Sequence, residues 1–214
     1  MLINLSDKNS IIQHYLTQIR DKEIQKDTLR FRKNLFRIAQ ILAYEISKQL
    51  NYESILTETP LTKVETRIIQ EKPIICSILR AGLVMHEGFL DFYDQSDSAF
   101  ISAYRKHSSS GEFEIIVEYM ASPNLKDKTI ILVDPMLATG RSMYLAYQAL
   151  CKHGKPKNVF IASLIVSEQG LVYVKRFMPN ATIITAAIDK DLNENSYIVP
   201  GLGDAGDLAY GVKL

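Results

Sequence analysis

The chain has 214 residues, of which 47% are hydrophobic and 23% are charged, and its formal net charge is +1. These values are typical of a soluble globular protein, and the length fits one domain with a substantial core. So small a net charge gives no general attraction to nucleic acid or to a membrane surface, and we expect neither as a partner. An anion bound by this protein has to be held by local geometry.

The cysteines and the N-terminus bear on the cellular compartment. Cys76 and Cys151 both lie in apolar segments, which is typical of buried free thiols. Two cysteines in a chain of this size do not form a disulfide scaffold. Residues 1–7 lack the basic and apolar regions of a signal peptide, and no window approaches the ~18 apolar residues of a membrane span. We therefore predict a cytoplasmic protein.

Two amphipathic helices are predicted near the N-terminus. The first begins at a capping box, Ser10-x-x-Gln13, after which one face carries Ile12, Tyr15, Leu16 and Ile19. The second runs from about Asp27 to Leu50, and its apolar stripe consists of Phe31, Leu35, Ile38, Leu42 and Ile46. We expect both helices to pack against the body of the protein or against a partner subunit.

From Pro73 onward, short β-rich runs alternate with helical segments. The predicted strands are Ile74–Leu79, Ala99–Tyr104, Ile115–Tyr119, Thr129–Val133, Val159–Val166 and Thr182–Ala187. The predicted helices are Leu83–Tyr93, Ser142–Cys151 and Glu168–Phe177. Uninterrupted apolar runs such as Thr129–Val133 indicate strands that are buried on both faces. The alternation predicts an α/β fold with a mainly parallel sheet flanked by helices, in which ligands bind at the carboxyl ends of the strands.

The segment from Asp191 to Leu214 breaks this alternation. It contains Pro200 and glycines at positions 201, 203, 206 and 211, with Asp204 and Asp207 between them. Glycine and aspartate favour turns, so a plain surface loop is one interpretation. Long irregular segments are uncommon in compact domains and are often functional, and we therefore favour a functional loop.

The segment from Ile130 to Met143 indicates a phosphate site. An apolar strand leads into Asp134, then into a short loop of small and hydroxyl residues, and then into a helix. The first N–H groups of a helix have no intrahelical partner, and the helix dipole places partial positive charge there, so a phosphate fits without many basic side chains. Thr139 and Ser142 add hydroxyl donors, and Gly140 permits close approach of the backbone. Asp134 is placed to accept hydrogen bonds from ribose hydroxyl groups.

Two common nucleotide-binding motifs are absent from this segment. No Gly-Lys-Ser/Thr follows the loop, which excludes a Walker loop, and the dinucleotide fingerprint Gly-x-Gly-x-x-Gly is missing. The residues by themselves also permit an ordinary strand–loop–helix turn with Ser142 as the helix N-cap.

Residues 133–140, Val-Asp-Pro-Met-Leu-Ala-Thr-Gly, resemble a known motif. They are similar to the segment with which type I phosphoribosyltransferases bind PRPP (5-phosphoribosyl-1-diphosphate), and in particular to that of the uracil phosphoribosyltransferases. Other members have two adjacent acidic residues, and Val133 fills the first of these positions, as the uracil branch allows.

Three further segments agree with this resemblance. Residues 78–83, Ile-Leu-Arg-Ala-Gly-Leu, resemble the pyrophosphate loop of the family, and residues 104–111 resemble the arginine and mobile loop that close over PRPP. Residues 192–193 and 197–207 resemble the uracil-binding loop, and the run Tyr-Ile-Val-Pro-Gly-Leu-Gly-Asp-Ala-Gly-Asp is highly specific. The four motifs come in the expected order between about Leu61 and Gly211.

The resemblance implies a single phosphoribosyltransferase domain over residues 1–214. N-terminal helices are expected over residues 1–60 and a uracil-binding loop region over residues 188–214. The implied reaction transfers the 5-phosphoribosyl group of PRPP to N1 of uracil and gives UMP and pyrophosphate in pyrimidine salvage. Mg²⁺ is expected to arrive bound to PRPP, without a metal site formed by the protein alone. A homodimer or higher homo-oligomer is expected and GTP is a candidate effector, although the sequence does not decide whether GTP activates.

The site residues that the resemblance implies fall into three sets. The expected catalytic residues are Arg80 and Arg105, which would neutralise the leaving pyrophosphate, and Asp134 and Asp204. The expected PRPP-binding residues are Arg80, Arg105, Asp134, Pro135, Met136, Leu137, Ala138, Thr139, Gly140, Arg141, Ser142 and Asp204. The expected uracil-binding residues are Ile198, Gly203, Asp204 and Ala205. Residues 105–112 are expected to form a lid, and Asp204 either contacts PRPP or helps to receive the N1 proton.

Three positions depart from the family pattern. Arg141 stands where the phosphate loop of the family usually has glycine, and it would be strained if the backbone needed a positive φ there. Leu208 stands where a basic residue is usual, and Lys106 where an acidic or polar residue is expected. None of these departures removes a residue assigned to the chemistry.

Other functions remain as alternatives. The specific run at residues 197–207 argues against a purine phosphoribosyltransferase, and the small net charge without a dense basic stripe argues against a regulatory protein that binds RNA. A third alternative is a catalytically silent binder of uracil or a nucleotide, and only a measurement of activity can exclude it. The histidines lack the spacing of metal ligands, so we interpret none of His14, His86, His107 and His153 as a zinc ligand.

Overall fold

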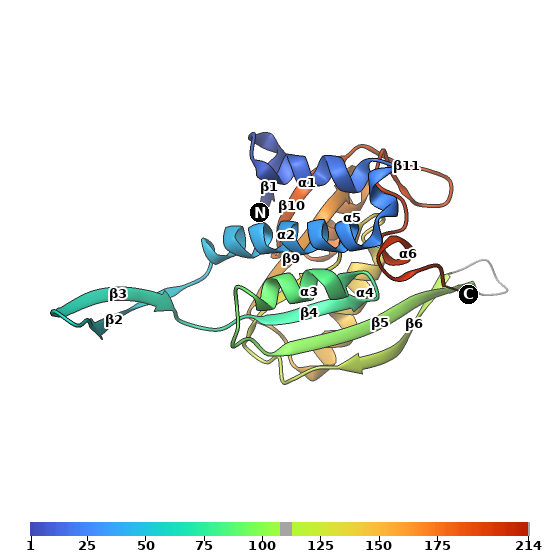
Figure 1. Ribbon diagram of the computed structural model, residues 1–214. Coiled ribbons are helices and arrows are strands. Elements are labelled where there is room, and N and C mark those ends of the chain that lie inside the picture. The colour runs from blue at the N-terminus through green and yellow to red at the C-terminus, as the bar shows by residue number, and fades with distance from the viewer. Residues whose placement is uncertain (108–112, 214) are drawn as a thin grey trace.

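The computed structural model describes residues 1–107 and 113–213, and of residues 103–107 and 113–117 it describes the backbone alone (Figure 1). The helices are α1 (Ile11–Arg20), α2 (Thr28–Ser47), α3 (Gly82–Leu90), α4 (Arg141–Leu150), α5 (Glu168–Phe177) and α6 (Ala205–Tyr210). The strands are β1 (Leu2–Asn4), β2 (Tyr52–Glu58), β3 (Lys63–Ile69), β4 (Ile74–Leu79), β5 (Ser98–His107), β6 (Phe113–Ala121), β7 (Thr129–Val133), β8 (Met136–Leu137), β9 (Asn158–Ser167), β10 (Thr182–Asp189), β11 (Asp191–Leu192) and β12 (Ile198–Val199).

The central sheet has the strand order β1-β10-β9-β7-β4-β5-β6. Neighbouring strands from β1 to β5 along this order pair in parallel, β8 adds a parallel pairing with β9, and β6 runs antiparallel to β5. The predicted mainly parallel sheet flanked by helices is therefore confirmed. β4, β7 and α5 have the predicted bounds, and the other predicted strands extend a few residues further.

The side chains of the sheet alternate between two apolar cores. Ile131 and Val133 of β7 belong to the core that α1, α2 and α3 cover, whereas Ile130 and Leu132 belong to the core that α4 and α5 cover. All four side chains are fully buried. Burial on both faces is the reason why this strand is an uninterrupted apolar run in the sequence.

The two predicted N-terminal helices are present as α1 and α2, and they differ in how their first turns are capped. Asp27 caps α2, and its carboxylate accepts a hydrogen bond from the N–H of Arg30 at 3.1 Å. Ser10 is the N-cap residue of α1, but its side chain accepts no hydrogen bond from the first turn of the helix. The predicted capping box is therefore wrong. The side-chain amide of Gln13 donates through Nε2 to the carbonyl of Lys8 at 3.3 Å, which ties this side chain to the segment before the helix.

A β-hairpin follows α2, and the prediction of N-terminal helices over residues 1–60 is wrong from residue 52 onward and at β1, which is a strand of the central sheet. β2 and β3 pair with each other and with no other described strand, and they project from the body of the molecule (Figure 1). Leu56 is 68% exposed and Val64 is 44% exposed. Because the body buries neither face of the hairpin, its sequence lacks the regular apolar alternation of a half-buried strand.

The described part of the chain contains no helix that is both long enough and apolar enough to cross a membrane. Cys76 is buried, as predicted, and burial raises the pKa of its thiol. Cys151 is only half-buried, so the prediction of a buried thiol is wrong there. Neither cysteine forms a disulfide bond.

Gly88 sets how closely α3 approaches α2. A Cβ atom at this position would lie 2.7 Å from the carbonyl oxygen of Phe36 and 2.8 Å from the Cβ atom of Ala39. We expect Gly88→Ala to lower the free energy of unfolding by about 1–3 kcal/mol, although alanine is the better helix former, because the helices would have to separate. Urea unfolding measures this change. Glu87→Ala, at an exposed position of α3, is the control, and an equal effect of both substitutions would contradict the prediction.

Candidate active site

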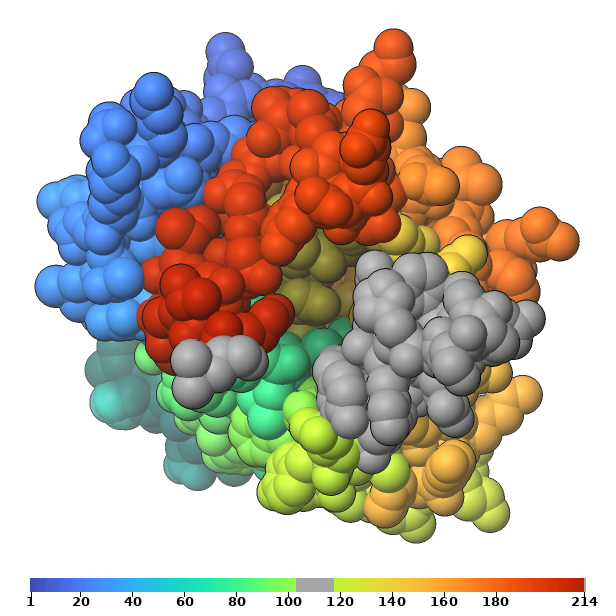
Figure 2. All heavy atoms as spheres, turned by 90° about the vertical axis from the view of Figure 1, so that its right-hand side faces the viewer, coloured from blue at the N-terminus to red at the C-terminus, as the bar shows by residue number. Residues whose placement is uncertain are grey.

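A cavity of about 780 Å³ lies at the carboxyl ends of the parallel strands. Its walls come from the turn after β4, the loop after β7, the start of α4 and the C-terminal segment between β11 and α6. Figure 2 shows this face hollowed beside the red C-terminal segment. Eight of the predicted site residues line the cavity, namely Arg80, Asp134, Met136, Ala138, Ser142, Ile198, Asp204 and Ala205.

The loop after β7 is held by hydrogen bonds to its own backbone and to the start of α5. The carboxylate of Asp134 accepts a hydrogen bond from the N–H of Met136 at 3.3 Å, and the hydroxyl of Thr139 accepts one from the N–H of Arg141 at 3.4 Å. The hydroxyl of Ser167 donates to the carbonyl of Ala138 and accepts from the N–H of Gly170 at 2.8 Å. The loop therefore keeps a fixed shape in front of α4.

Gly140 and Arg141 show how the loop accommodates the departure from the family pattern. The positive φ, 75°, falls on Gly140, and Arg141 is the first residue of α4. A Cβ atom at Gly140 would lie 2.9 Å from the carbonyl oxygen of Gly170, so only glycine fits. Arginine at position 141 therefore causes no backbone strain, and its side chain is exposed.

The remaining predicted residues of this loop lie off the cavity wall. Pro135 is buried, and its carbonyl accepts hydrogen bonds from the N–H groups of Leu164 and Ile165, both at 3.0 Å. Leu137 is in the core that α4 and α5 cover. Neither they nor Thr139, Gly140 and Arg141 are among the residues that line the cavity. Their assignment to phosphate binding stays a prediction.

Asp134 is the electrostatically perturbed group of the cavity. Burial at the end of β7 raises the pKa of its carboxyl to about 7, and the negative charge of Asp204 adds to this effect, whereas the hydrogen bond from Met136 opposes it. A carboxyl group with such a pKa in a cavity is typical of a functional site. A cationic ligand near Asp134 would restore its ionised form at neutral pH.

Arg80 lies in the turn between β4 and α3, whose Leu79–Arg80 peptide bond is cis. Its guanidinium forms an ion pair with Asp207 at 2.8 Å and donates to the carbonyl of Gly211 at 3.3 Å. The side chain remains 42% exposed and lines the cavity. Tight packing fixes the turn, since a Cβ atom at Gly82 would lie 2.7 Å from the carbonyl oxygen of Val133.

The C-terminal segment is a structured loop and not a plain surface turn. β11 and β12 pair antiparallel, and the side chain of Asn193 accepts hydrogen bonds from the N–H groups of Asn195 and Tyr197, at 3.0 and 2.9 Å. Asp204 then caps α6 by accepting a hydrogen bond from the N–H of Asp207 at 2.9 Å. Gly203 is exposed and does not line the cavity.

Several residues that line the cavity were not predicted from the sequence. They are Glu118, Asn195, Ser196 and Lys213, whereas Ile78, Leu79, Ala81, Tyr197 and Gly206 lie within the predicted pyrophosphate and uracil-binding loops without having been assigned a contact. Lys213 forms an ion pair with Asp204 at 3.6 Å, which brings a basic group to the site although Leu208 replaces the expected one. Leu208 itself packs against the core that α1, α2 and α3 cover. No local pattern marks Lys213, because only the fold of the C-terminal segment returns it to the cavity.

The predicted arginine and lid lie largely outside the described residues. The backbone of Arg105 pairs with that of Ile115 in the β5–β6 ladder, but its side chain is not among those described, and residues 108–112 of the lid lie outside the described ranges. The side chain of Lys106 is not described either. The roles of these residues stay predictions.

His86 is a buried side chain that is hydrogen-bonded within the core and does not line the cavity. Its Nδ1 and Nε2 atoms form hydrogen bonds with the hydroxyl groups of Ser77 and Ser98, at 2.7 and 3.0 Å, and burial lowers the pKa of its imidazole to about 4. In the part of the chain that the structure describes, no three or more histidine, cysteine or acidic side chains are grouped to hold a metal ion.

The raised pKa of Asp134 predicts how stability depends on pH. The folded state binds the carboxyl proton of Asp134 more tightly than the unfolded state does. The protonated side chain therefore makes its full contribution to stability below pH ~4, and this contribution is lost as the pH rises through about 7. Asp134→Asn keeps an acceptor for Met136 and cannot ionise. We expect it to raise the free energy of unfolding by about 1–4 kcal/mol at pH 8 and by less at pH 5.

Urea unfolding at the two pH values measures this difference. Asp94→Asn, the same chemical change at an exposed position between α3 and β5, is the matched control. An equal gain in stability at pH 5 and pH 8 for Asp134→Asn would contradict the electrostatic explanation.

Comparison with known proteins shows the family of the chain. The model of the uracil phosphoribosyltransferase family matches residues 6–212. The chain is 50% identical over 214 residues to a uracil phosphoribosyltransferase of Porphyromonas gingivalis, covering 100% of this chain and 99% of that one. It is 40% identical over 210 residues to that of Sulfolobus acidocaldarius, covering 94% and 96%.

A solved structure has the same fold along its whole length. The AQ2163 protein from Aquifex aeolicus superposes with a TM-score of 0.87 and 29% identity, and the match covers 100% of both chains. The match to the family model and the identity to full-length relatives leave one conclusion. The chain belongs to the uracil phosphoribosyltransferase family.

Proposed function

We propose that this protein transfers the 5-phosphoribosyl group of PRPP to N1 of uracil and releases pyrophosphate, as a step of pyrimidine salvage. The observation that carries the proposal is the single cavity onto which the turn of Arg80, the loop of Asp134 and the segment from Asn195 to Gly206 converge. Membership of the family supports it. The cytoplasmic location stays a prediction from the sequence.

Arg80 is proposed to bind the departing pyrophosphate. Negative charge grows on this group as its bond to C1 of the ribose breaks, and a guanidinium binds phosphate oxygens through two parallel hydrogen bonds. Arg80 already borders the cavity, and its ion pair with Asp207 fixes its direction. Arg105 is proposed to act with it, on the resemblance alone.

The start of α4 is proposed to hold the 5-phosphate of the ribose. Its first N–H groups have no partner within the helix, and the helix dipole favours an anion there. Ala138 and Ser142 bring this end of the helix to the cavity wall. Asp134 would accept hydrogen bonds from the ribose hydroxyl groups and so orient C1 toward the attacking nitrogen. Positioning of this kind lowers a barrier by several kcal/mol, on the order of 7–11 at most.

The segment around Ile198, Asp204 and Ala205 is proposed to bind uracil. Uracil presents a carbonyl oxygen on each side of its N3–H group, and backbone N–H and C=O groups of an irregular segment match that pattern. Cytosine carries an amino group in place of one oxygen, which would leave a buried donor without a partner. Asp204 borders the cavity, and its proposed role is either to contact PRPP or to receive the N1 proton.

The carboxylates of the cavity suit a magnesium ion that arrives on PRPP. Mg²⁺ is commonly held by one or two carboxylates together with substrate phosphates. Asp134 and Asp204 both border the cavity, and the charge of Asp204 raises the cost of ionising Asp134 in the absence of a cation. When bound, the ion would share the neutralisation of the pyrophosphate charge.

Formation of UMP from radiolabelled uracil, PRPP and Mg²⁺ tests the proposal. We expect turnover of uracil, and turnover of cytosine and hypoxanthine lower by about 10²-fold or more.

Asp134→Asn should lower kcat/KM for PRPP by about 10- to 100-fold while it stabilises the fold, and Asp94→Asn should retain activity. The same assay with added GTP tests whether GTP is an effector. Uracil binding without UMP formation would instead support a silent binder.

We also propose that two copies of the chain associate through the β2–β3 hairpin. A two-stranded hairpin alone in water is marginally stable, yet this one projects with Leu56 68% and Leu61 95% exposed. Apolar side chains gathered on a projecting element are typical of a protein–protein contact. A second copy is the simplest partner, because most soluble oligomers are symmetric homo-oligomers.

Sedimentation velocity over a range of concentrations tests this association. Leu56→Glu places a charge in the proposed contact, and we expect it to weaken the dimer by at least about tenfold. Val172→Glu on α5 is the matched control, because Val172 is also 68% exposed and receives the same charge away from the hairpin. A monomeric wild-type protein, or equal dissociation of both variants, would contradict the proposal.

A further inference from the structure

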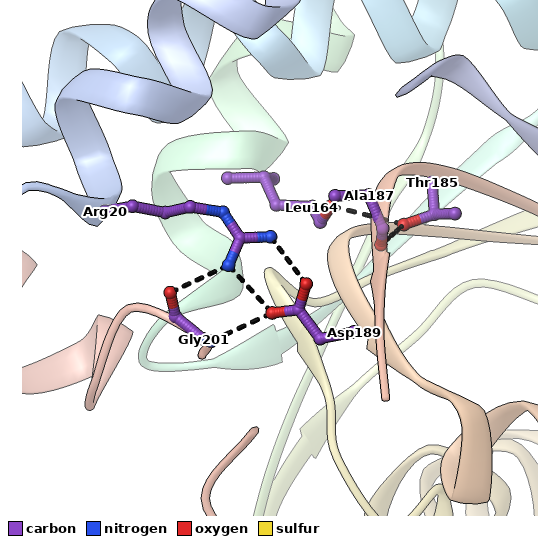
Figure 3. Close-up of polar contacts among 6 residues, drawn as sticks. All are labelled: Arg20, Leu164, Thr185, Ala187, Asp189 and Gly201. Atoms are coloured by element: carbon purple, nitrogen blue, oxygen red, sulfur yellow. Dashed lines mark hydrogen bonds and ion pairs between the residues drawn. The ribbon is translucent and has the colours of Figure 1, made fainter. Parts of the chain in front are cut away.

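An ion pair between residues that do not line the cavity holds the proposed uracil-binding segment at Gly201 (Figure 3). Arg20, the last residue of α1, binds both carboxylate oxygens of Asp189, the last residue of β10, at 2.7 and 2.8 Å. The side chain of Asp189 is 7% exposed and that of Arg20 is 24% exposed. The two parallel hydrogen bonds fix the plane of the guanidinium as well as its distance.

The same two side chains hold Gly201 by both of its backbone polar groups. Arg20 donates to the carbonyl of Gly201 at 2.9 Å, and the N–H of Gly201 donates to Asp189 at 2.9 Å. Gly201 is buried and has a φ of 56°. A Cβ atom there would lie 2.0 Å from the carbonyl oxygen of Ile198, so the backbone of Gly201 packs directly on that of Ile198.

Gly201 is the midpoint between the two cavity-lining ends of this segment. Ile198 lines the cavity on one side of it and Asp204 on the other, whereas Gly201, Arg20 and Asp189 are not among the lining residues. A displacement of Gly201 would therefore move Ile198, on whose backbone it packs, against the bound base, whereas Asp204 is held separately by its capping bond from the N–H of Asp207. The start of α4 and the turn of Arg80 would stay in place, because neither contacts this ion pair in the described residues.

We infer that Arg20 and Asp189 are positioning residues that set the affinity of the cavity for uracil. The inference rests on the proposed function, since it concerns the base that the C-terminal segment binds. The ion pair acts through Gly201 and Ile198 and touches no substrate. Its effect therefore falls on KM for uracil and leaves KM for PRPP nearly unchanged. A purely structural ion pair would change the stability of the fold without separating the two KM values.

Steady-state kinetics of Arg20→Gln tests the inference. Glutamine is uncharged and cannot bind both oxygens of Asp189 and the carbonyl of Gly201 together. We expect KM for uracil to rise by about 10- to 100-fold and KM for PRPP to change by less than about threefold. Arg20→Lys keeps the charge and one of the contacts, and its KM for uracil should lie between those of the wild type and Arg20→Gln.

Lys26→Gln is the matched control, because Lys26 forms an exposed ion pair with Glu23 just after α1 and should leave both KM values unchanged. If Arg20→Gln does not fold, the KM values of Arg20→Lys decide. An unchanged KM for uracil in the folded variant, or an equal rise of both KM values, would overturn the inference. A wild-type protein that forms no UMP would instead refute the proposed function, so the two failures are distinguishable.

Discussion

Parallel pairing of buried strands is the constraint on which the candidate site depends. Because β4, β7, β9 and β10 run in the same direction, the residues that follow them meet at one edge of the sheet. Arg80, Asp134 and Asp189 are far apart in the sequence and come from three of these strand ends. The strands are held between two apolar cores, so the edge offers a fixed base on which the loops are built.

The charged groups at this edge are arranged for binding at some cost in stability. Asp134 is placed where burial and Asp204 oppose its ionisation, and a ligand with positive charge would relieve this opposition. Asp189 is nearly as buried as a core residue, but it has a bidentate partner in Arg20. Removing one partner of a buried ion pair costs about 3–5 kcal/mol. In the proposed function Asp134 serves the substrate, whereas Asp189 holds the C-terminal segment through Arg20 and Gly201.

The N-terminal helices act as a support for the C-terminal segment. Arg20 of α1 binds Gly201, and Arg32 of α2 donates to the carbonyl of Ala209 in α6 at 2.8 Å. The apolar faces of α1 and α2 meanwhile cover the sheet. The first part of the chain thus supports the C-terminal segment, which lines the cavity, whereas the body buries neither face of the hairpin that follows α2.

The buried strands, their helices and the motifs around Arg80, Asp134 and Asp204 could be predicted from the sequence, because apolar runs and loop residues are local patterns. The β2–β3 hairpin could not, since the body buries neither of its faces and its apolar residues follow no period. Tertiary packing alone places Leu137 off the cavity wall and brings Lys213 to it. It also pairs Arg20 with Asp189, 169 residues away. Such contacts depend on how distant segments pack, which no local pattern records.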